Sequence, residues 1–241
     1  MTTVSVVTVT FNNAGGLRET LNSLACLQSQ PLEVAVIDGA SIDDTAAVVR
    51  EFGASLPLSF LSEPDQGIYD AMNKGHSLCR GDFIHYLNAG DTVFGEPYRE
   101  VAQACLLPVH VHDESGRFFF KEFLRHGGFG YCHQGILLPR NHASYRQEYR
   151  VAADLDMMIA TFPQGMRGLP RVERAGVRYT LGGVSSRAGS ARDREVRSIF
   201  FERLPWWAAS RLQAGIVLKG LLPRGLRRLL VKAMHGGEPA R

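Results

Sequence analysis

The sequence predicts an α/β fold in which a mostly parallel sheet is flanked by helices and followed by a C-terminal amphipathic helical appendage. The prediction depends on three observations: short β-branched apolar segments, helical patterns that alternate with them, and a basic C-terminal stretch. Strands that alternate with helices pair in parallel through right-handed crossovers. We expect one domain over residues 1–190, with halves at about 1–95 and 96–190, and an appendage over residues 191–241.

Four strand candidates occupy the N-terminal half of the chain. VSVVTVTF at residues 4–11 and LEVAVIDG at residues 32–39 are short and almost continuously apolar, as strands buried in a parallel sheet are. LSFLSE at residues 58–63 and DFIHYLNAGD at residues 82–91 follow, and both finish in polar residues. We expect these four segments to pair in one sheet.

Helical patterns separate the strand candidates. After the break NNAGG, the side chains of Leu17, Leu21 and Leu24 recur on one helical face. SIDDT at residues 41–45 supplies side chains that can cap a second helix. GIYDAMNKGHSLC at residues 67–79 is expected to be the third helix. Each helix therefore connects one strand to the next.

The composition excludes several classes of protein. Of the 241 residues, 45% are hydrophobic and 21% are charged, which is typical of a soluble globular domain with a sizeable core. The chain has no run of about 18 apolar residues, no signal-peptide pattern, and four scattered cysteines without a CxxC pair. We therefore expect a cytoplasmic protein with reduced thiols. Neither GxGxxG nor GxxxxGK[ST] is present, which argues against dinucleotide-binding and P-loop sites.

Polar residues gather at the predicted carboxyl ends of the four strands. They are Asn12, Asp38, Glu63, Asp65, Asn88 and Asp91. Ligands of open α/β sheets bind at this edge. Any one of these residues alone could instead cap the helix that follows its strand. A shared ligand site accounts for all of them together, and we adopt that interpretation.

Four segments carry a resemblance to a known family: SVVTVTFN, VIDGASIDDT, SEPDQGIYDAMNKG and FIHYLNAGD. In this order and spacing they resemble the nucleotide-sugar-binding half of family 2 glycosyltransferases, which have the Rossmann-like GT-A fold. The last two segments are similar to a subgroup of bacterial exopolysaccharide and O-antigen glycosyltransferases. The resemblance covers residues 3–95, weakens over residues 96–126, and returns in GFGYCHQGILLPR and YRVAADLDMM.

The resemblance implies a set of nucleotide-sugar-binding residues. They are Asn12, Asp38, Glu63, Asp65, Asn73, Lys74, Asn88, His133 and Gln134. Asp38 would accept hydrogen bonds from the base or ribose, and Glu63 and Asp65 would shape the same pocket. Lys74 would face the ribose or diphosphate as a mobile point charge, and an exposed helical lysine is the structural alternative. The segment that contains His133 would contact donor phosphate or acceptor sugar, unless His133 is a core residue.

The segment LNAGD at residues 87–91 stands where the family has an acidic D-x-D-type element. Of its acids only Asp91 is left, because Asn88 and Gly90 take the other two positions. Mg²⁺ often uses one or two carboxylates together with substrate phosphates. The resemblance therefore implies that Asp91 and the donor diphosphate hold a divalent cation, Mg²⁺ or Mn²⁺. The structural alternative is an aspartate that caps the turn after Gly90.

The segment VAADLDMM at residues 151–158 resembles the start of the helix that carries the family's general base. Asp154 aligns with that acid, and Ala153 replaces the glutamate that commonly precedes it. Inverting transfer needs a carboxylate that takes the proton of the acceptor hydroxyl. Asp156 is the rival candidate, although it lies two residues on and would point to another face of the helix. The resemblance favours Asp154.

The C-terminal stretch is strongly basic. Residues 192–241 contain eleven Lys or Arg and four Asp or Glu, so they carry +7 while the rest of the chain carries −4. Trp206, Trp207 and an apolar stripe of Leu226, Leu229 and Leu230 are typical of interfacial amphipathic helices. No stacking platform or recognition motif accompanies the charge, so nucleic acid is not an expected partner. Peripheral membrane contact is the prediction, and packing of the tail on the domain is the alternative.

Together these features predict an inverting glycosyltransferase of bacterial surface polysaccharide biosynthesis. The donor would be a UDP- or GDP-sugar, and the acceptor a glycan carried on a polyprenyl diphosphate at the cytoplasmic face of the membrane. Two other functions stay open. A nucleotidyltransferase also binds nucleotides on an α/β sheet, but TFNNAGGLRET is a poor phosphate loop. A non-catalytic nucleotide-sugar-binding module would account for the loss of two acids from the D-x-D-type segment at residues 87–91.

Overall fold

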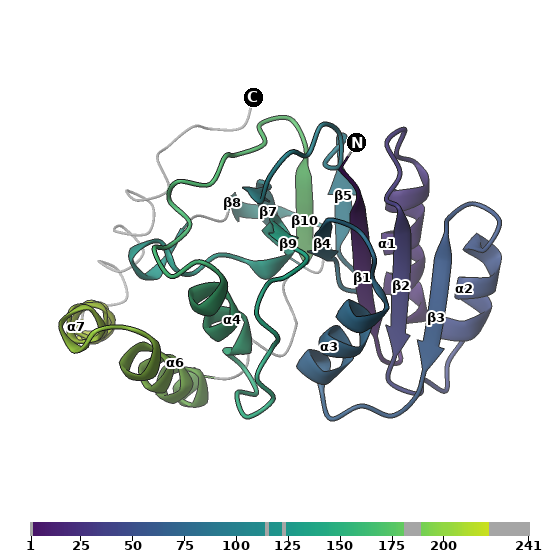
Figure 1. The fold of residues 1–241 in the computed structure, drawn as a ribbon. Coiled ribbons are helices and arrows are strands. Elements are labelled where there is room, and N and C mark those ends of the chain that lie inside the picture. Colours follow the sequence, from purple (N-terminus) through teal and green to yellow (C-terminus); the bar gives the residue numbers. More distant parts are fainter. Residues whose placement is uncertain (1, 114–115, 122–123, 181–188, 222–241) are drawn as a thin grey trace.

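The computed structural model describes residues 2–113, 116–121, 124–180 and 189–221. These residues contain two β-sheets. The larger sheet has six strands in the order β3-β2-β1-β4-β9-β6, and the smaller has four in the order β5-β10-β7-β8 (Figure 1). Parallel pairs predominate in the larger sheet, which has helices on both faces. The predicted α/β class with a mostly parallel sheet is therefore confirmed.

The four strands expected in the N-terminal half are neighbours in the larger sheet. β1 (Val4–Thr10) lies between β2 (Glu33–Asp38) and β4 (Phe83–Tyr86), and β3 (Leu58–Ser62) pairs with β2. All these pairs are parallel. β1, β2 and β4 are buried along their whole length, as their continuous apolar pattern predicts. The carboxyl ends of the four strands therefore share one edge.

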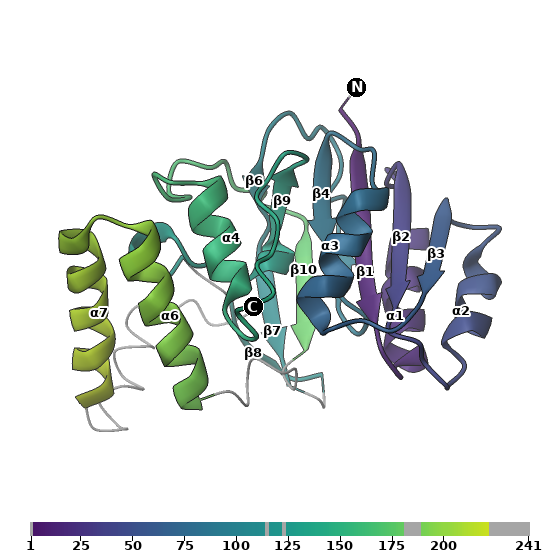
Figure 2. The ribbon, with the colours of Figure 1, turned by 60° about the horizontal axis from the view of Figure 1, so that its bottom comes forward.

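Three helices connect these strands. α1 (Ala14–Ala25) and α2 (Thr45–Phe52) cover one face of the sheet, and α3 (Ile68–Leu78) covers the other (Figures 1 and 2). The buried face of α1 is the leucine face expected from the sequence. Gly75 lets α3 approach β1 closely, because a Cβ at Gly75 would lie 2.4 Å from Cγ1 of Val7.

The second half of the chain completes the larger sheet and builds the smaller one. β9 (Ile136–Pro139) runs antiparallel to β4, and β6 (Cys105–Leu106) runs antiparallel to β9. The strands of the smaller sheet are β5 (Thr92–Phe94), β7 (Val109–His112), β8 (Phe118–Lys121) and β10 (Gly176–Thr180). Two short 3₁₀ helices, η1 (His126–Gly128) and η2 (His133–Gly135), precede β9.

Three further helices lie side by side at the end of the molecule opposite β3. They are α4 (Ala153–Thr161), α6 (Gly189–Arg203) and α7 (Trp206–Leu221), in that order away from the sheet (Figure 2). Ile199 and Phe200 of α6 are fully buried, and they belong to the same hydrophobic core as the strands. The position of α4 relative to the sheet is therefore tied to α6.

α6 and α7 lie where the sequence predicts the C-terminal helical appendage, although α6 contributes side chains to the core. The predicted apolar stripe at residues 226–230 lies outside the described residues, and the domain boundary at residue 190 stays a prediction. Trp206 and Trp207, at the start of α7, are 76% and 59% exposed. Within the ranges that the structure describes, no helix is both long enough and apolar enough to cross a membrane.

Candidate active site

Asp38, the last residue of β2, is buried at the edge where the parallel strands end. Its carboxylate accepts hydrogen bonds from the amide and hydroxyl of Ser41, and from the hydroxyl of Ser62 at 2.6 Å. The hydroxyl oxygen of Ser41 also accepts from the amide of Asn12 at 2.7 Å, and Asn12 Oδ1 accepts from the amide of Ile42 at 3.0 Å. Asp38 and Asn12 are therefore fixed in one hydrogen-bonded cluster, and their nucleotide-sugar-binding roles stay predictions.

Phe11 is a candidate ligand-binding residue that the sequence reasoning did not identify. Its ring is 64% exposed directly after β1. A Cβ at Gly39 would lie 2.8 Å from Asp65 Oδ2 and 3.2 Å from Phe11 Cδ2, so the ring and this carboxylate meet beside Gly39. Asp65 also accepts a hydrogen bond from the amide of Gly67 at 2.8 Å. An exposed aromatic ring next to an acid offers a flat apolar surface and a hydrogen-bond acceptor together.

Asn73 and Lys74 on α3 both have partners within the protein. Lys74 Nζ lies 2.8 Å from Glu63 Oε1 and 3.5 Å from Asp70 Oδ2. The hydrogen bond to Glu63 is the main cause of a raised pKa for Lys74. The Asn73 side chain donates to the carbonyl of Tyr145 at 2.8 Å and accepts from the amide of Tyr145 at 3.0 Å. Asn73 therefore attaches the loop that contains Tyr145 to α3. The ligand-binding roles of Asn73 and Lys74 stay predictions.

Asp91 is nearly fully buried, with 6% of its surface exposed. Its Oδ1 accepts a hydrogen bond from the amide of Thr180 on β10 at 3.0 Å, and its Oδ2 accepts from the side chain of Gln134 on η2. Burial raises the pKa of Asp91 to about 7, and the two hydrogen bonds oppose the shift. Gln134 is itself 1% exposed, so its ligand-binding role stays a prediction.

This arrangement does not fit a prepared cation site at Asp91. Both carboxylate oxygens are already occupied by hydrogen-bond donors, whereas Mg²⁺ and Mn²⁺ require free oxygen ligands. No group of three or more His, Cys, Asp or Glu that could hold a metal ion occurs among the described residues. The metal-ligand role of Asp91 therefore stays a prediction.

His133 and Asp154 come together from separate segments. His133 Nδ1 in η2 lies 3.9 Å from Asp154 Oδ2 in α4, and His133 Nε2 lies 3.5 Å from the side-chain nitrogen of Asn88. The next residue, Ala89, donates its amide to the carbonyl of Val9 in β1 at 3.1 Å. A continuous series of contacts therefore joins the end of β1 to Asp154.

The environment of Asp154 suits a proton acceptor. Asp154 lies in the first turn of α4, and its side chain is 27% exposed. Burial raises the pKa of Asp154. The neighbouring His133, the amide of Leu155 and the charge of Arg125 together outweigh burial and hold the pKa below its usual value. The carboxylate is therefore ionised at neutral pH and can accept a proton.

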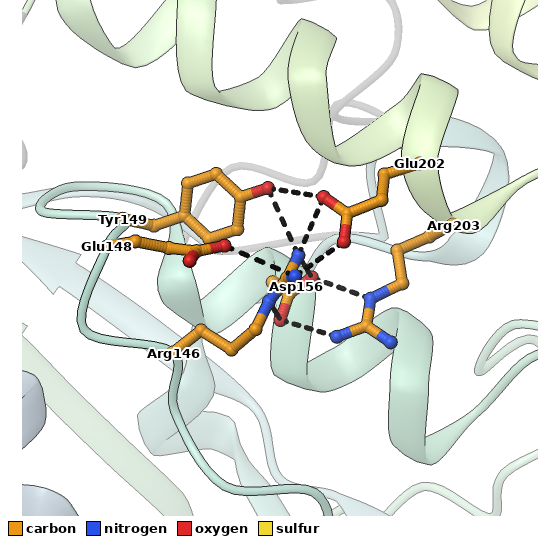
Figure 3. A network of polar contacts seen from close by, with 6 residues as sticks. All are labelled: Arg146, Glu148, Tyr149, Asp156, Glu202 and Arg203. Atoms are coloured by element: carbon orange, nitrogen blue, oxygen red, sulfur yellow. Dashed lines mark hydrogen bonds and ion pairs between the residues drawn. The ribbon is translucent and has the colours of Figure 1, made fainter.

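Asp156, the rival to Asp154, is fully buried in a network of polar contacts (Figure 3). Arg203 Nε lies 2.7 Å from Asp156 Oδ1, and Arg146 Nη2 lies 2.8 Å from the same oxygen. Asp156 Oδ2 accepts from both guanidinium groups as well, and Glu202 pairs with Arg146. With both oxygens held by cations, Asp156 is unsuited to act as a base, which favours Asp154.

Comparison with known sequences agrees with this geometry. Residues 5–104 match the model of the family described as glycosyl transferase family 2. A PGL/p-HBAD biosynthesis glycosyltransferase of Mycobacterium tuberculosis is 27% identical over 250 residues, which cover 94% of this chain and 93% of that protein. An uncharacterized glycosyltransferase of the same organism is 39% identical over 104 residues, covering 42% of this chain and 38% of that protein.

Solved structures share the fold. TarS of S. aureus, residues 1–349 with UDP-GlcNAc, superposes with a TM-score of 0.69 at 18% identity over 89% of this chain and 71% of that one. The chain spans 43% of the longer TarS structure. The mannosyltransferase PcManGT of Pyrobaculum calidifontis, with GDP-Man and Mn²⁺, superposes with a TM-score of 0.57 at 17% identity over 97% and 79%. The match over residues 5–104 and the similar glycosyltransferases support a family 2 glycosyltransferase, and the solved structures show that the chain has the fold of GT-A enzymes.

Proposed function

We propose that this enzyme transfers a sugar from a nucleotide-diphosphate donor to a glycan acceptor with inversion of configuration. One observation carries the proposal: the series of contacts from β1 through Ala89 and Asn88 to His133 and Asp154. This series links the strand edge that holds Asp38 to an ionised carboxylate on α4. Sugar transfer needs a donor pocket and a base close to each other. The contacts from β1 to Asp154 support such an arrangement.

The proposed donor is a UDP- or GDP-sugar. Support comes from the two structural neighbours, which contain UDP-GlcNAc and GDP-Man. It also comes from the exposed ring of Phe11, because stacking of a base on an aromatic ring contributes about 1–3 kcal/mol. Asp65 lies beside this ring, and Asp38 and Asp65 would accept hydrogen bonds from the base or ribose.

The proposed general base is Asp154. The acceptor hydroxyl attacks the anomeric carbon, and the bond from that carbon to the diphosphate oxygen breaks. The nucleoside diphosphate leaves with the electron pair, while Asp154 takes the hydroxyl proton. Because the groups around Asp154 together hold its pKa below the usual value, the carboxylate is ionised at neutral pH and can take the proton. One carboxylate serves this reaction, in contrast to the paired carboxylates of most glycoside hydrolases.

A divalent cation, Mg²⁺ or Mn²⁺, is proposed from the family resemblance and from the neighbour whose structure contains Mn²⁺. For Asp91 to serve as its ligand, the carboxylate must exchange Thr180 or Gln134 for the cation. Turnover measured with and without EDTA tests the requirement. Unchanged turnover in EDTA would show that the diphosphate is neutralised by protein cations instead.

The proposed acceptor is a glycan on a polyprenyl diphosphate at the cytoplasmic face of the membrane, in bacterial surface polysaccharide biosynthesis. The exposed Trp206 and Trp207 support membrane contact, because tryptophan favours the headgroup region. The charge of +7 over residues 192–241 supports it as well, since anionic lipids attract Lys and Arg.

Donor turnover by the purified enzyme tests the proposal. We expect a UDP- or GDP-sugar to raise the melting temperature, and slow hydrolysis of that donor to be lost in Asp154→Asn while the thermal shift remains. Asp193→Asn, at an exposed acid on α6, is the matched control. A donor that binds but is never cleaved, even with glycan acceptors, would indicate a binding module. Inversion is read from the anomeric configuration of the product.

A further inference from the structure

Helix α6 holds the segment that leads into α4, the helix that carries Asp154. The Glu195 carboxylate on α6 accepts hydrogen bonds from three consecutive backbone amides. They are those of Arg150 at 3.0 Å and of Val151 and Ala152 at 2.9 Å each. The three amides belong to the residues directly before the first turn of α4. One side chain therefore fixes the whole entry to the helix.

The helix start has no capping side chain of its own. Ala152 is the N-cap residue of α4, and alanine has no hydrogen-bond acceptor in its side chain. Ser, Thr, Asp or Asn usually occupies this position. A carboxylate near a helix N-terminus is also favoured by the helix dipole. Glu195, which lies 43 residues further along the chain than Ala152, supplies the carboxylate from a neighbouring helix.

The same segment is held at two further points. The carbonyl of Val151 accepts a hydrogen bond from the hydroxyl of Tyr69 on α3 at 3.0 Å. On the other side of Asp154, Arg203 of α6 pairs with Asp156. Glu195 and Arg203 are about two helical turns apart on α6. The backbone of Asp154 therefore lies between two anchor points on one helix.

We propose that Glu195 is a positioning residue for the transfer reaction, which fixes the backbone from which Asp154 projects toward His133. The inference rests on the proposed role of Asp154 as the general base. A base must lie within hydrogen-bond reach of the acceptor hydroxyl, and a misplacement of about 1 Å can cost roughly 10²-fold in rate. Glu195 acts through the peptide backbone, at a distance from the reacting atoms.

Two variants of Glu195 test the proposal. Glu195→Ala removes all three hydrogen bonds, and the isosteric Glu195→Gln keeps one acceptor oxygen. We expect kcat to fall roughly 10- to 100-fold in Glu195→Ala and by less in Glu195→Gln, with donor Kd nearly unchanged. The amides of residues 150–152 should exchange with solvent faster in both variants. Asp193→Asn, at the exposed acid on the same helix, should change neither kcat nor the exchange.

A double variant distinguishes positioning from a general loss of structure. If Glu195 acts through Asp154, adding Glu195→Gln to Asp154→Asn lowers kcat no further, because residues that act as a unit are not additive. Full additivity would overturn the proposal, and so would wild-type kcat in Glu195→Gln despite faster amide exchange. If Glu195→Ala does not fold, Glu195→Gln still gives the answer. Wild-type kcat in Asp154→Asn alone would instead overturn the proposed function.

Discussion

The strand ends that carry Asp38 and Asn12, here called the donor edge, differ from the surroundings of Asp154. The two regions differ in how far apart their bonded residues lie along the chain. At the donor edge, Asp38 bonds to Ser41 and to Ser62, which are 3 and 24 residues further on. Asn12 bonds to Ile42, 30 residues further on. Around α4 the contacts reach farther, since Asp156 and Arg203 are 47 residues apart. The donor edge therefore forms from the first strands and the loops that follow them, whereas the base depends on how α6 packs on α4.

This difference has a physical consequence. Closing a longer loop costs more conformational entropy, and the contacts of Asp156 with Arg203 also require α6 to be packed in place. The donor edge is expected to keep its geometry when α6 is perturbed, and the α4 region is not. Each of the following variants tests one side of this contrast.

The largest effect is expected at Asp154. Asp154→Asn keeps the shape of the side chain and removes its basicity, so kcat should fall about 10²- to 10⁴-fold, or roughly 3 to 5 kcal/mol of barrier. Donor affinity should hardly change, because the donor edge is built independently. The measurement is kcat at saturating donor together with donor Kd. Parallel losses of kcat and donor affinity would contradict the separation of the two regions.

Asp156→Asn should act on stability instead of chemistry. The change leaves Arg146 and Arg203 without their buried carboxylate (Figure 3). We expect a loss of about 3 kcal/mol in the free energy of unfolding, at the lower end of the range for broken buried pairs. The lower value reflects guanidinium groups that are 29% and 30% exposed. Urea unfolding gives the measurement, with Glu148→Gln, at a 62% exposed acid of the same network, as the matched control.

The sequence predicted the fold because local apolar patterns encode the buried strands and helix faces, whereas the roles of the polar residues at the donor edge stay predictions. Continuous apolar runs identified β1, β2 and β4, and the polar residues that follow the strands included Asp38. The partners of Asn73 and Asp156 could not be predicted, because Tyr145 and Arg203 reach them only through tertiary packing. Glu195 gave no signal either, since a glutamate on a polar helix usually faces solvent. In this chain, the contacts that form only when distant segments pack together could not be predicted from the sequence.

Asp91, whose carboxylate joins Thr180 of β10 to Gln134 of η2, gives a pH dependence of known sign. Its native pKa of about 7 lies above the ordinary value near 4, so the native state binds the proton more tightly between these two values. Stability should therefore decrease as pH rises from about 4 to about 7, by at most about 1.4 kcal/mol per pH unit. Asp91→Asn should flatten this dependence in thermal melts.

The outcome also decides between a structural role and a metal-binding role for Asp91. Unchanged donor binding by Asp91→Asn, with and without EDTA, would support a carboxylate that mainly joins Thr180 and Gln134. Loss of a cation-dependent part of donor binding in the variant would support the metal-ligand prediction.

A smaller effect is expected at Phe11. Phe11→Ala removes the exposed ring beside Gly39 and Asp65, and donor affinity should fall by about 1–3 kcal/mol. Phe11→Tyr keeps the flat surface and should bind the donor normally. Phe118→Ala, at a phenylalanine that is 45% exposed on β8, is the matched control. Calorimetric titration with the donor gives Kd for each variant. Equal affinity in Phe11→Ala would show that the ring does not contact the base.

The smallest effect is expected at the start of α7. Replacing Trp206 and Trp207 by alanine removes two exposed rings while leaving the basic charge of the tail in place. Partitioning onto anionic vesicles should weaken roughly tenfold, or about 1.4 kcal/mol, while donor Kd stays unchanged because Asp38 and Asn12 bond to residues 41–62, which are distant from α7 along the chain. Ile42→Ala, at an apolar residue that is 94% exposed, controls for loss of surface hydrophobicity. Deletion of residues 205–241 should abolish the partitioning while leaving donor binding largely intact. Equal vesicle binding by wild type and truncated protein would remove the tail from the membrane proposal, whereas unfolding on truncation would indicate that the tail packs on the domain.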